Sequence, residues 1–257
     1  MQPYQSRTLA ALRIPHGFTR RDPSLPADGA ISWNVGRETA LANRRVWWRR
    51  LGVPLDSTVF PHQVHADRVA KVTRAERGCG AERPESAIRE TDALVTAESG
   101  LALAVQCADC VPILIYAPDI PAVAAIHAGW RGTVQRILDR VLDLLLDEGQ
   151  RPEALWVVFG PSIGPCCYEV GEDVAAAWLA ATCGTGAPAL SRRSGRLTFD
   201  LWRANRLLLE QRGVPADRIE VSGICTRCRP DEWFSYRACG PRAGVQAAVI
   251  ALPCDAE

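Results

Sequence analysis

Apolar residues along the chain fall into short runs typical of strands and longer periodic stretches typical of helices. The strand-like runs are rich in Val, Ile, Leu and Ala and lie at residues 59–65, 93–97, 101–106, 111–117, 122–128, 155–160, 219–225 and 245–252. The clearest helix spans about Thr133 to Asp147, because its apolar residues recur on one face. Further helices are predicted at 37–51, near 171–181 and at 200–212, the last with Asp200 as its N-cap.

Predicted strands and helices are mixed along the chain without strict alternation, and no internal repeat or Gly/Ser linker divides them. Residues 20–31 and 78–86 are rich in Pro, Gly and charged residues and are expected to be surface loops. The pattern predicts one mixed α/β domain over residues 1–257, with its sheets covered by helices.

Composition and charge exclude several classes of protein. The 30 basic and 29 acidic residues nearly cancel, so the chain has no general electrostatic attraction for nucleic acid or anionic lipid. The apolar share of 47% argues against disorder, yet no apolar run is long enough to span a membrane. The N-terminus lacks a convincing signal peptide, so we expect a cytoplasmic protein whose ten cysteines are mostly reduced thiols.

Residues 106–133 carry the richest chemistry. Cys110 precedes one predicted strand and His127 closes the next, while Arg131 lies between Gly129 and Gly132 where a helix is expected to begin. The free N–H groups of a helix start, together with a guanidinium, would form a phosphate or anion site. A capping turn with a solvated arginine is the simpler alternative.

Histidines and cysteines suggest a metal site. If residues 59–65 are extended, His62 and His65 point to opposite faces, and the same parity separates Cys107 from Cys110. A buried site would therefore take one histidine and one cysteine. The set His65, Cys110 and His127 would give three ligands and an open fourth position, as in catalytic zinc sites. Each residue alone is equally compatible with a hydrogen-bonded core position.

Two other motifs are weaker. The Cys-x2-Cys pairs at 107–110 and 225–228 are too far apart in the sequence for a zinc ribbon. Ser162 lies in a G-x-S-x-G motif after a predicted strand, but no histidine follows His127 to complete a hydrolase triad, and Pro165 prevents the helix that such a motif requires.

A family resemblance connects these motifs. QVHADRV, TDALVT, ADCVPILIY, IHAGWRGT, FGPSIGPCCYEVG, ICTRC and WFSYR, spread over about residues 16–246, resemble the laccase-domain (polyphenol oxidase) family. Its members are described as purine nucleoside phosphorylases and some as peptidoglycan editing factors. The resemblance implies a single α+β domain with mixed sheets flanked by helices, and zinc ligands at His65, Cys110 and His127.

The implied activity is that of a zinc-dependent purine nucleoside phosphorylase. It would cleave adenosine, inosine, guanosine and S-methyl-5'-thioadenosine with phosphate, and deaminate adenosine as a second activity, as a monomer or homodimer. Cys110, His127 and Arg131 are the expected catalytic residues. The candidate substrate contacts, on motif grounds, are Arg20, Asn34, Gln63, Asp92, Ser162, Tyr168 and Arg237.

Departures from the family pattern bear on the substrate. DPSLPADG replaces a Gly-Gly-Val-Ser-like loop within residues 20–31, and the 238–245 segment places Val245 where an arginine is expected. Both changes are expected to affect specificity at the rim of the pocket.

Three alternative functions remain open from the sequence. A cysteine-dependent amidase that edits peptidoglycan precursors would use Cys110 as nucleophile with His127 or His65 as base. A copper polyphenol oxidase is disfavoured because four histidines are too few for a multicopper enzyme, although one adventitious copper could occupy the same three ligands. A non-enzymatic binding module is the third.

Overall fold

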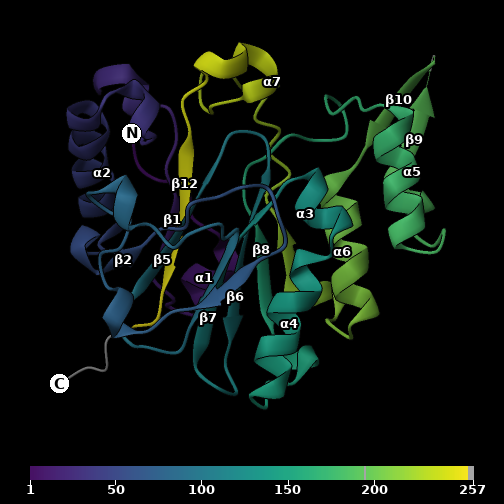
Figure 1. Cartoon of the computed structure of the whole chain (residues 1–257), viewed down its shortest axis with the longest axis horizontal. Helices are drawn as coiled ribbons and strands as arrows, with labels where there is room; N and C mark the ends of the chain where they lie inside the picture. The colour runs from purple at the N-terminus through teal and green to yellow at the C-terminus, as the bar shows by residue number, and fades with distance from the viewer. Residues whose placement is uncertain (194, 254–257) are drawn as a thin grey trace.

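The computed structural model describes residues 1–193 and 195–253, which form an α+β fold. Two mixed sheets pack face to face between two layers of helices (Figure 1). The first sheet runs in the order β1 (His16–Phe18), β12 (Gln246–Ala251), β5 (Ala102–Cys107) and β2 (Thr58–Val59). The second runs in the order β11 (Ile219–Val221), β8 (Trp156–Phe159), β6 (Val111–Ala117), β7 (Ala122–Ala128), β4 (Ala93–Thr96) and β3 (Val69–Lys71).

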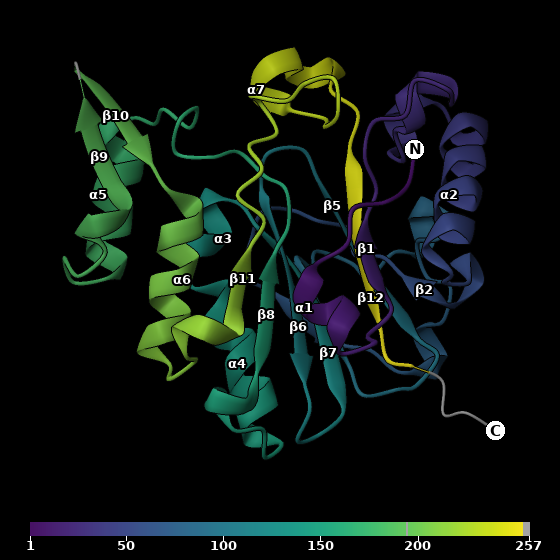
Figure 2. The same cartoon turned by 180° about the vertical axis from the view of Figure 1, so that it is seen from behind.

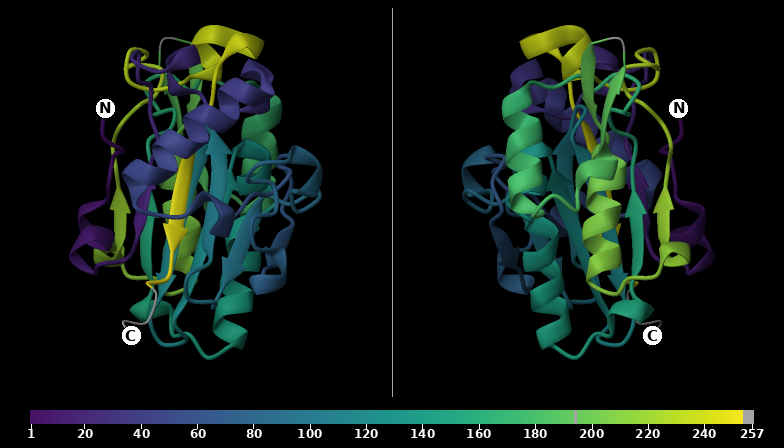
Figure 3. Two further views of the ribbon diagram at one scale, coloured as in Figure 1. Left: turned by 90° about the vertical axis from the view of Figure 1, so that its left-hand side faces the viewer. Right: turned by 90° about the vertical axis from the view of Figure 1, so that its right-hand side faces the viewer.

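The four longest helices are divided between the two outer faces. Figure 2 shows the same layers from behind, and Figure 3 shows α2 across the outer side of the first sheet in one view and α4 to α6 in the opposite view. A hairpin of β9 (Leu190–Arg193) and β10 (Arg196–Phe199) lies beside α5. The helices are α1 (Arg7–Ala11), α2 (Arg37–Leu51), α3 (Trp130–Val134), α4 (Ile137–Asp147), α5 (Glu172–Ala181), α6 (Leu201–Gln211) and α7 (Tyr236–Cys239).

Alternation along the strands explains the layers. On β6, Ile113 packs into the core shared with α4 and α6, whereas its neighbour Leu114 packs between the two sheets. On β5, Leu103 also lies between the sheets, while Ala104 packs with the buried Trp48 of α2. Fully burying one such large side chain contributes about 1.5–3 kcal/mol. Both faces of each sheet are therefore apolar and covered.

Long apolar runs are predicted well and short or irregular segments are not. The strands expected at 111–117 and 122–128 match β6 and β7 residue for residue. The helix expected at 200–212 is α6, and its N-cap Asp200 accepts a hydrogen bond from the N–H of Arg203. The sequence pattern does not predict β1, β3 or the β9–β10 hairpin, because strands of three or four residues carry little periodicity.

Three predicted elements are wrong in their extent. The strand expected at 219–225 stops at Val221, and Cys225 lies in the loop beyond it. The strand expected at 59–65 ends at Val59, and His65 has a left-handed φ of 61°. The helix expected from Thr133 to Asp147 is two helices, since Arg136 takes a left-handed φ of 61° between α3 and α4. Apolar spacing continues across this break, so periodicity alone does not reveal it.

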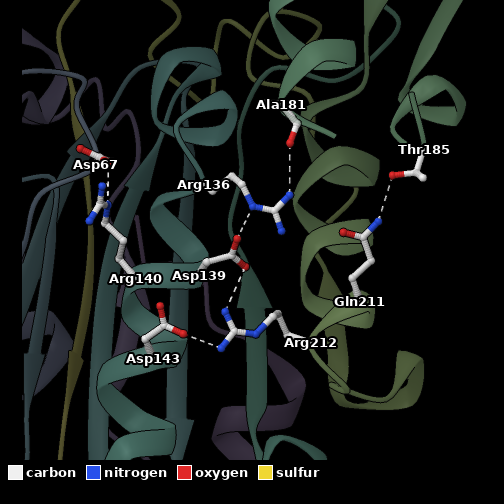
Figure 4. Close-up of polar contacts among 9 residues, drawn as sticks. All are labelled: Asp67, Arg136, Asp139, Arg140, Asp143, Ala181, Thr185, Gln211 and Arg212. Carbon is white, nitrogen blue, oxygen red and sulfur yellow. Dashed lines mark hydrogen bonds and ion pairs between the residues drawn. The ribbon is translucent and has the colours of Figure 1, made fainter. Parts of the chain in front are cut away.

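Ion pairs fasten the helical layer (Figure 4). Arg212 follows α6 and reaches two carboxylates of α4, with 3.6 Å to Asp139 and 2.5 Å to Asp143. Arg140 of α4 donates to Asp67 at 2.5 Å, which ties the loop after β2 to this helix. No helix among the described residues has the length and apolar character that crossing a membrane demands.

A buried arginine joins α2 to the loops around it. Arg44 has no solvent exposure, and it donates to the carbonyls of Ile31 at 3.0 Å and of Gly80 and Ala81 at 2.8 Å each. Its guanidinium also lies 4.0 Å from the ring centroid of Trp33 and 4.3 Å from that of Phe60. A desolvated charge needs such contacts, so Arg44 fixes both loops and both rings.

We expect Arg44→Lys to lower the free energy of unfolding by about 2 kcal/mol. An ammonium cannot reproduce the planar fork that spans the carbonyls of Ile31, Gly80 and Ala81, and a buried carbonyl left without a donor is costly. Urea unfolding measures the difference. The matched control is Arg45→Lys, whose side chain is 60% exposed, and which should change stability by less than about 0.5 kcal/mol. Equal effects of the two substitutions would contradict this role.

Candidate active site and metal centre

Three side chains from separate segments meet at one end of the sheets. His65 comes from the loop after β2, Cys110 from the connection between β5 and β6, and His127 from β7. Their donor atoms all lie within 4.8 Å of one another, and the two imidazole rings are edge to face with centroids 4.7 Å apart. Gly129 makes room for them, because a Cβ there would lie 2.9 Å from the sulfur of Cys110.

Asp92 organises this cluster. Its buried carboxylate accepts from the backbone N–H groups of Val64 at 3.1 Å and of His65 and Ala66 at 3.0 Å each. It also lies 2.7 Å from Nδ1 of His127. Since an ionised carboxylate only accepts, Nδ1 donates its proton to Asp92, and Nε2 is the ring nitrogen that remains to bind a ligand when it gives up its own proton. The same contacts explain why the strand expected at 59–65 stops early. After Pro61 the backbone turns so that three of its N–H groups donate to the Asp92 carboxylate.

The negative charge of the Cys110 thiolate and the positive charge of His127 stabilise each other. Burial raises the pKa of the Cys110 thiol, but the neighbouring His127 and His65 outweigh it and bring that pKa down to about 6. Burial also disfavours a charged His127, but the Cys110 thiolate and Asp92 raise its pKa to about 9. Two imidazoles and one thiolate are the donor types that zinc prefers, and three of them leave one position open. These residues can therefore hold a metal ion.

A cavity of about 700 Å³ opens onto the cluster. Its volume is in the range of small-molecule sites. Five aromatic side chains are among its lining residues, those of Trp33, Phe60, Trp130, Tyr168 and Tyr236. The two tyrosines come from distant parts of the chain, and α7, at the top of Figure 1, supplies Tyr236. The cavity has the flat apolar surfaces that bind a planar ring.

Four sequence-predicted residues line this cavity besides the three donors of the cluster. They are Gln63, Arg131, Tyr168 and Arg237. The Arg131 guanidinium lies 4.5 Å from the ring centroid of Trp130, and the ion pairs of the described residues do not include it. Arg237 lies 5.1 Å from the ring centroid of Tyr168 and donates to the carbonyl of Glu169 at 2.9 Å. Arg131 is thus the freer of the two cations.

The other candidate substrate contacts lie outside the lining of the cavity. Asp92 stands behind the metal ligands, as described above. Arg20 pairs with Glu232, and Asn34 contacts the side chain of Ser32. Ser162 is fully buried, where it accepts from the indole of Trp202 at 2.6 Å and donates to the carbonyl of Gly160 at 3.1 Å. These four residues therefore make contacts within the protein and do not line the cavity.

The sequence analysis chose one histidine and one cysteine because residues three apart on a strand face opposite sides. The structure shows that this reason is wrong. His62 and His65 both line the cavity because their segment is a loop, although His62 does not belong to the three-donor cluster. Cys107 ends β5 with its side chain buried, and Cys110 is separated from it by a turn with Asp109 at φ 88°. Neither separation comes from an extended strand.

Asp109 is a cavity residue that the sequence analysis missed. Its carboxylate accepts from the Thr226 hydroxyl at 2.7 Å and from the N–H of Arg237 at 2.6 Å, and its carbonyl accepts from Ile163 at 2.9 Å. It therefore ties three segments to the residue next to Cys110. The sequence feature that could have identified Asp109 is its position in the ADC motif, directly before Cys110. Val245 also lines the cavity, so the departure from arginine there changes the lining itself.

Residues 16–253 match the model of a family described as multi-copper polyphenol oxidoreductase laccase. The chain belongs to this laccase family. Among its relatives, the purine nucleoside phosphorylase YlmD of Geobacillus stearothermophilus is 37% identical over 232 residues, which cover 89% of this chain and 84% of that protein. Adenosine deaminase RL5, from an unknown prokaryotic organism, is 38% identical over 196 residues, covering 76% and 75%.

Solved structures in the laccase family share the fold. The crystal structure of the hypothetical protein YfiH of Bacillus licheniformis aligns with a TM-score of 0.88 and 32% identity, covering 94% of this chain and 93% of that one. The predicted family and the predicted α+β class are both confirmed.

We expect Asp92→Asn to weaken metal binding at the three-donor cluster by about 10- to 100-fold, the usual effect of losing an outer carboxylate. The amide keeps the size of the side chain but cannot accept from His127 and three backbone N–H groups with a full negative charge. Competition with a chelator measures the affinity, and circular dichroism verifies the fold. Asp119→Asn, at a surface ion pair with Arg151, is the control and should leave metal affinity unchanged. Unchanged affinity in the Asp92 variant would refute the orienting role.

Proposed function

We propose that this protein is a zinc-dependent purine nucleoside phosphorylase. Its substrates would be adenosine, inosine, guanosine and S-methyl-5'-thioadenosine, with phosphate as the second substrate and deamination of adenosine as a second activity. The observation that carries the proposal is the three-donor cluster of His65, Cys110 and His127 opening onto an aromatic cavity of about 700 Å³. The names of the two curated relatives support it.

In this proposal His65, Cys110 and His127 hold one zinc ion per chain. When bound, zinc supplies Lewis-acid chemistry at the open position. Asp92 keeps the proton of His127 on Nδ1, away from the ligand side. The thiolate of Cys110 persists in a reducing compartment, so we place the protein in the cytoplasm. Copper could bind the same donors adventitiously, since divalent copper outcompetes zinc at many sites.

The remaining cavity residues are suited to the organic substrates. A purine base can stack on Tyr168, Trp33 or Phe60, which line the cavity. The Arg131 guanidinium would hold phosphate near the ribose, where positive charge develops as the base leaves. The side chain of Gln63 is occupied, because its amide exchanges two hydrogen bonds with the backbone of Gln106, at 2.7 and 2.8 Å. We therefore assign Gln63 a positioning role.

A cysteine-dependent amidase acting on peptidoglycan precursors is the second candidate. One observation favours it: Asp92, His127 and Cys110 form a carboxylate, base and thiol series in one cluster. Zinc would make the thiolate a weaker nucleophile, so the metal content of the active protein separates the two functions.

Metal-quantified protein incubated with a nucleoside panel, with and without phosphate, tests the proposal. We expect free base and ribose 1-phosphate only when phosphate is present, and inosine and ammonia from adenosine without it. His65→Ala should lose zinc and both activities, whereas His62→Ala, which changes a cavity residue outside the cluster, should keep its zinc. Turnover by zinc-free protein, or no nucleoside product at all, would overturn the proposal.

Arg131→Lys should slow phosphorolysis by about 10- to 100-fold, the equivalent of one charge-assisted hydrogen bond of roughly 1.5–3 kcal/mol. Lysine keeps the charge but loses the bidentate fork. Zinc content should stay unchanged and deamination should suffer less, because it needs no phosphate. Arg74→Lys, at a side chain 74% exposed, is the control. If deamination of adenosine falls as far as phosphorolysis in the same preparation, the phosphate assignment is wrong.

A further inference from the structure

Four cysteines outside the cluster described above gather at a second place. Cys166 and Cys167 lie in the turn that follows β8, and Cys225 and Cys228 lie in the loop that follows β11. Their four sulfur atoms all lie within 4.8 Å of one another, with 3.5 Å between Cys166 and Cys228 and 3.4 Å between Cys167 and Cys228. We propose that these four thiols bind a structural zinc ion, a second metal site independent of the proposed activity.

The distances suit tetrahedral zinc. A zinc–sulfur bond of about 2.3 Å places neighbouring sulfurs of a regular tetrahedron roughly 3.8 Å apart. The contacts of 3.4 and 3.5 Å and the limit of 4.8 Å bracket that value, so binding requires only small movements of the side chains. Four ligands also close the coordination sphere, which is typical of structural sites and unlike the open set at His65, Cys110 and His127.

The backbone positions the two loops against each other. Ser162 donates its N–H to the carbonyl of Ile224 at 3.1 Å, and Thr226 donates its N–H to the carbonyl of Ser162 at 3.0 Å. Gly164 lies at the centre of the arrangement, and a Cβ there would be 3.3 Å from Cβ of Cys225 and 2.9 Å from the ring of Trp202. The close approach of the loops thus depends on a residue without a side chain.

Two of the four sulfur atoms accept hydrogen bonds from neighbouring groups. The N–H of Gly164 donates to the sulfur of Cys225 at 3.3 Å, and the guanidinium of Arg227 donates to that of Cys167 at 3.6 Å. Four thiolates and one zinc ion carry a net charge of −2, which Arg227 partly offsets.

Packing does not account for this cluster. Cys225 is buried, but Cys166 and Cys228 are exposed and Cys167 is half-buried, whereas cysteines that act as small hydrophobes are normally buried. The sulfur contacts of 3.4 and 3.5 Å are far longer than a disulfide bond of about 2.0 Å, and all four thiols are free. The sequence analysis set the 225–228 pair aside because its apparent partner at 107–110 is too distant. Its partner in space is the adjacent pair at 166 and 167, which has no Cys-x2-Cys spacing.

A metal here would brace the cavity wall. Tyr168, which lines the cavity, directly follows Cys167. Thr226, between Cys225 and Cys228, donates to Asp109, the neighbour of Cys110. The second site would therefore fix one wall of the cavity without contacting the substrate.

Native mass spectrometry and metal analysis of the purified full chain test the proposal. We expect about two zinc ions per chain in the unaltered protein, the sum of one open and one closed site. Cys228→Ser and Cys110→Ala should each retain about one, and the double variant none. Cys183→Ser changes an exposed cysteine outside both clusters and should retain two. Cobalt-loaded Cys110→Ala should show the intense charge-transfer absorption of several thiolate ligands.

Two further variants keep the test decisive. Cys228→His supplies another zinc ligand at an exposed position, so it should retain two zinc ions even if Cys228→Ser does not fold. One zinc ion in the unaltered protein and none in Cys110→Ala would overturn the second site, as would a disulfide found between the two loops. Either of those results leaves the proposed nucleoside activity unaffected. If the unaltered protein binds two zinc ions but shows no nucleoside activity, only the proposed function is overturned.

Discussion

The candidate site depends on a single buried carboxylate. Asp92 precedes β4, and its carbonyl accepts from the N–H of His127 at 2.8 Å, so the ladder between β4 and β7 places its side chain beside that imidazole. Burial raises the pKa of this carboxyl, but the hydrogen bonds from His127 and from the backbone of Ala66 and Val64 bring it below the ordinary value. Removing a charge from water is costly unless such donors surround it. The requirement bends the chain at His65 and fixes the tautomer of His127 at once.

The site also lies where the two sheets are joined. The chain leaves the first sheet at the end of β5 and enters the second at β6, with Cys110 in the short connection between them. Asp109 turns this connection with φ 88°, a conformation that few residues other than glycine adopt. Its hydrogen bonds to Thr226 and Arg237 hold the strained residue in place. Strain of this kind is typical of functional sites.

Prediction from sequence succeeded for elements whose signal lies in their own residues. Both faces of β6 and β7 are buried, so their apolar runs identify them, and Asp200 announces the start of α6. It failed for the loop after Val59, whose shape is set by Asp92, more than 25 residues further along the chain. Local periodicity carries no record of such a contact. The same limit explains why the sequence did not connect the cysteine pair at 225–228 with the pair at 166 and 167, whereas the three residues of the His65, Cys110 and His127 cluster were named together with the help of a family resemblance.

Loops and short helices form much of the cavity wall, and polar groups hold three of these segments in place. Asp92 holds the segment of His65, Arg44 holds the rings of Trp33 and Phe60, and Asp109 holds the segment of Arg237. Loops expose much of their backbone and cannot be fixed by apolar packing alone. Buried hydrogen bonds to charged groups are directional, so they set the position of a segment more narrowly than apolar contacts do. The apolar layers thus supply the stability of the fold, whereas a few buried charges set the geometry of the site.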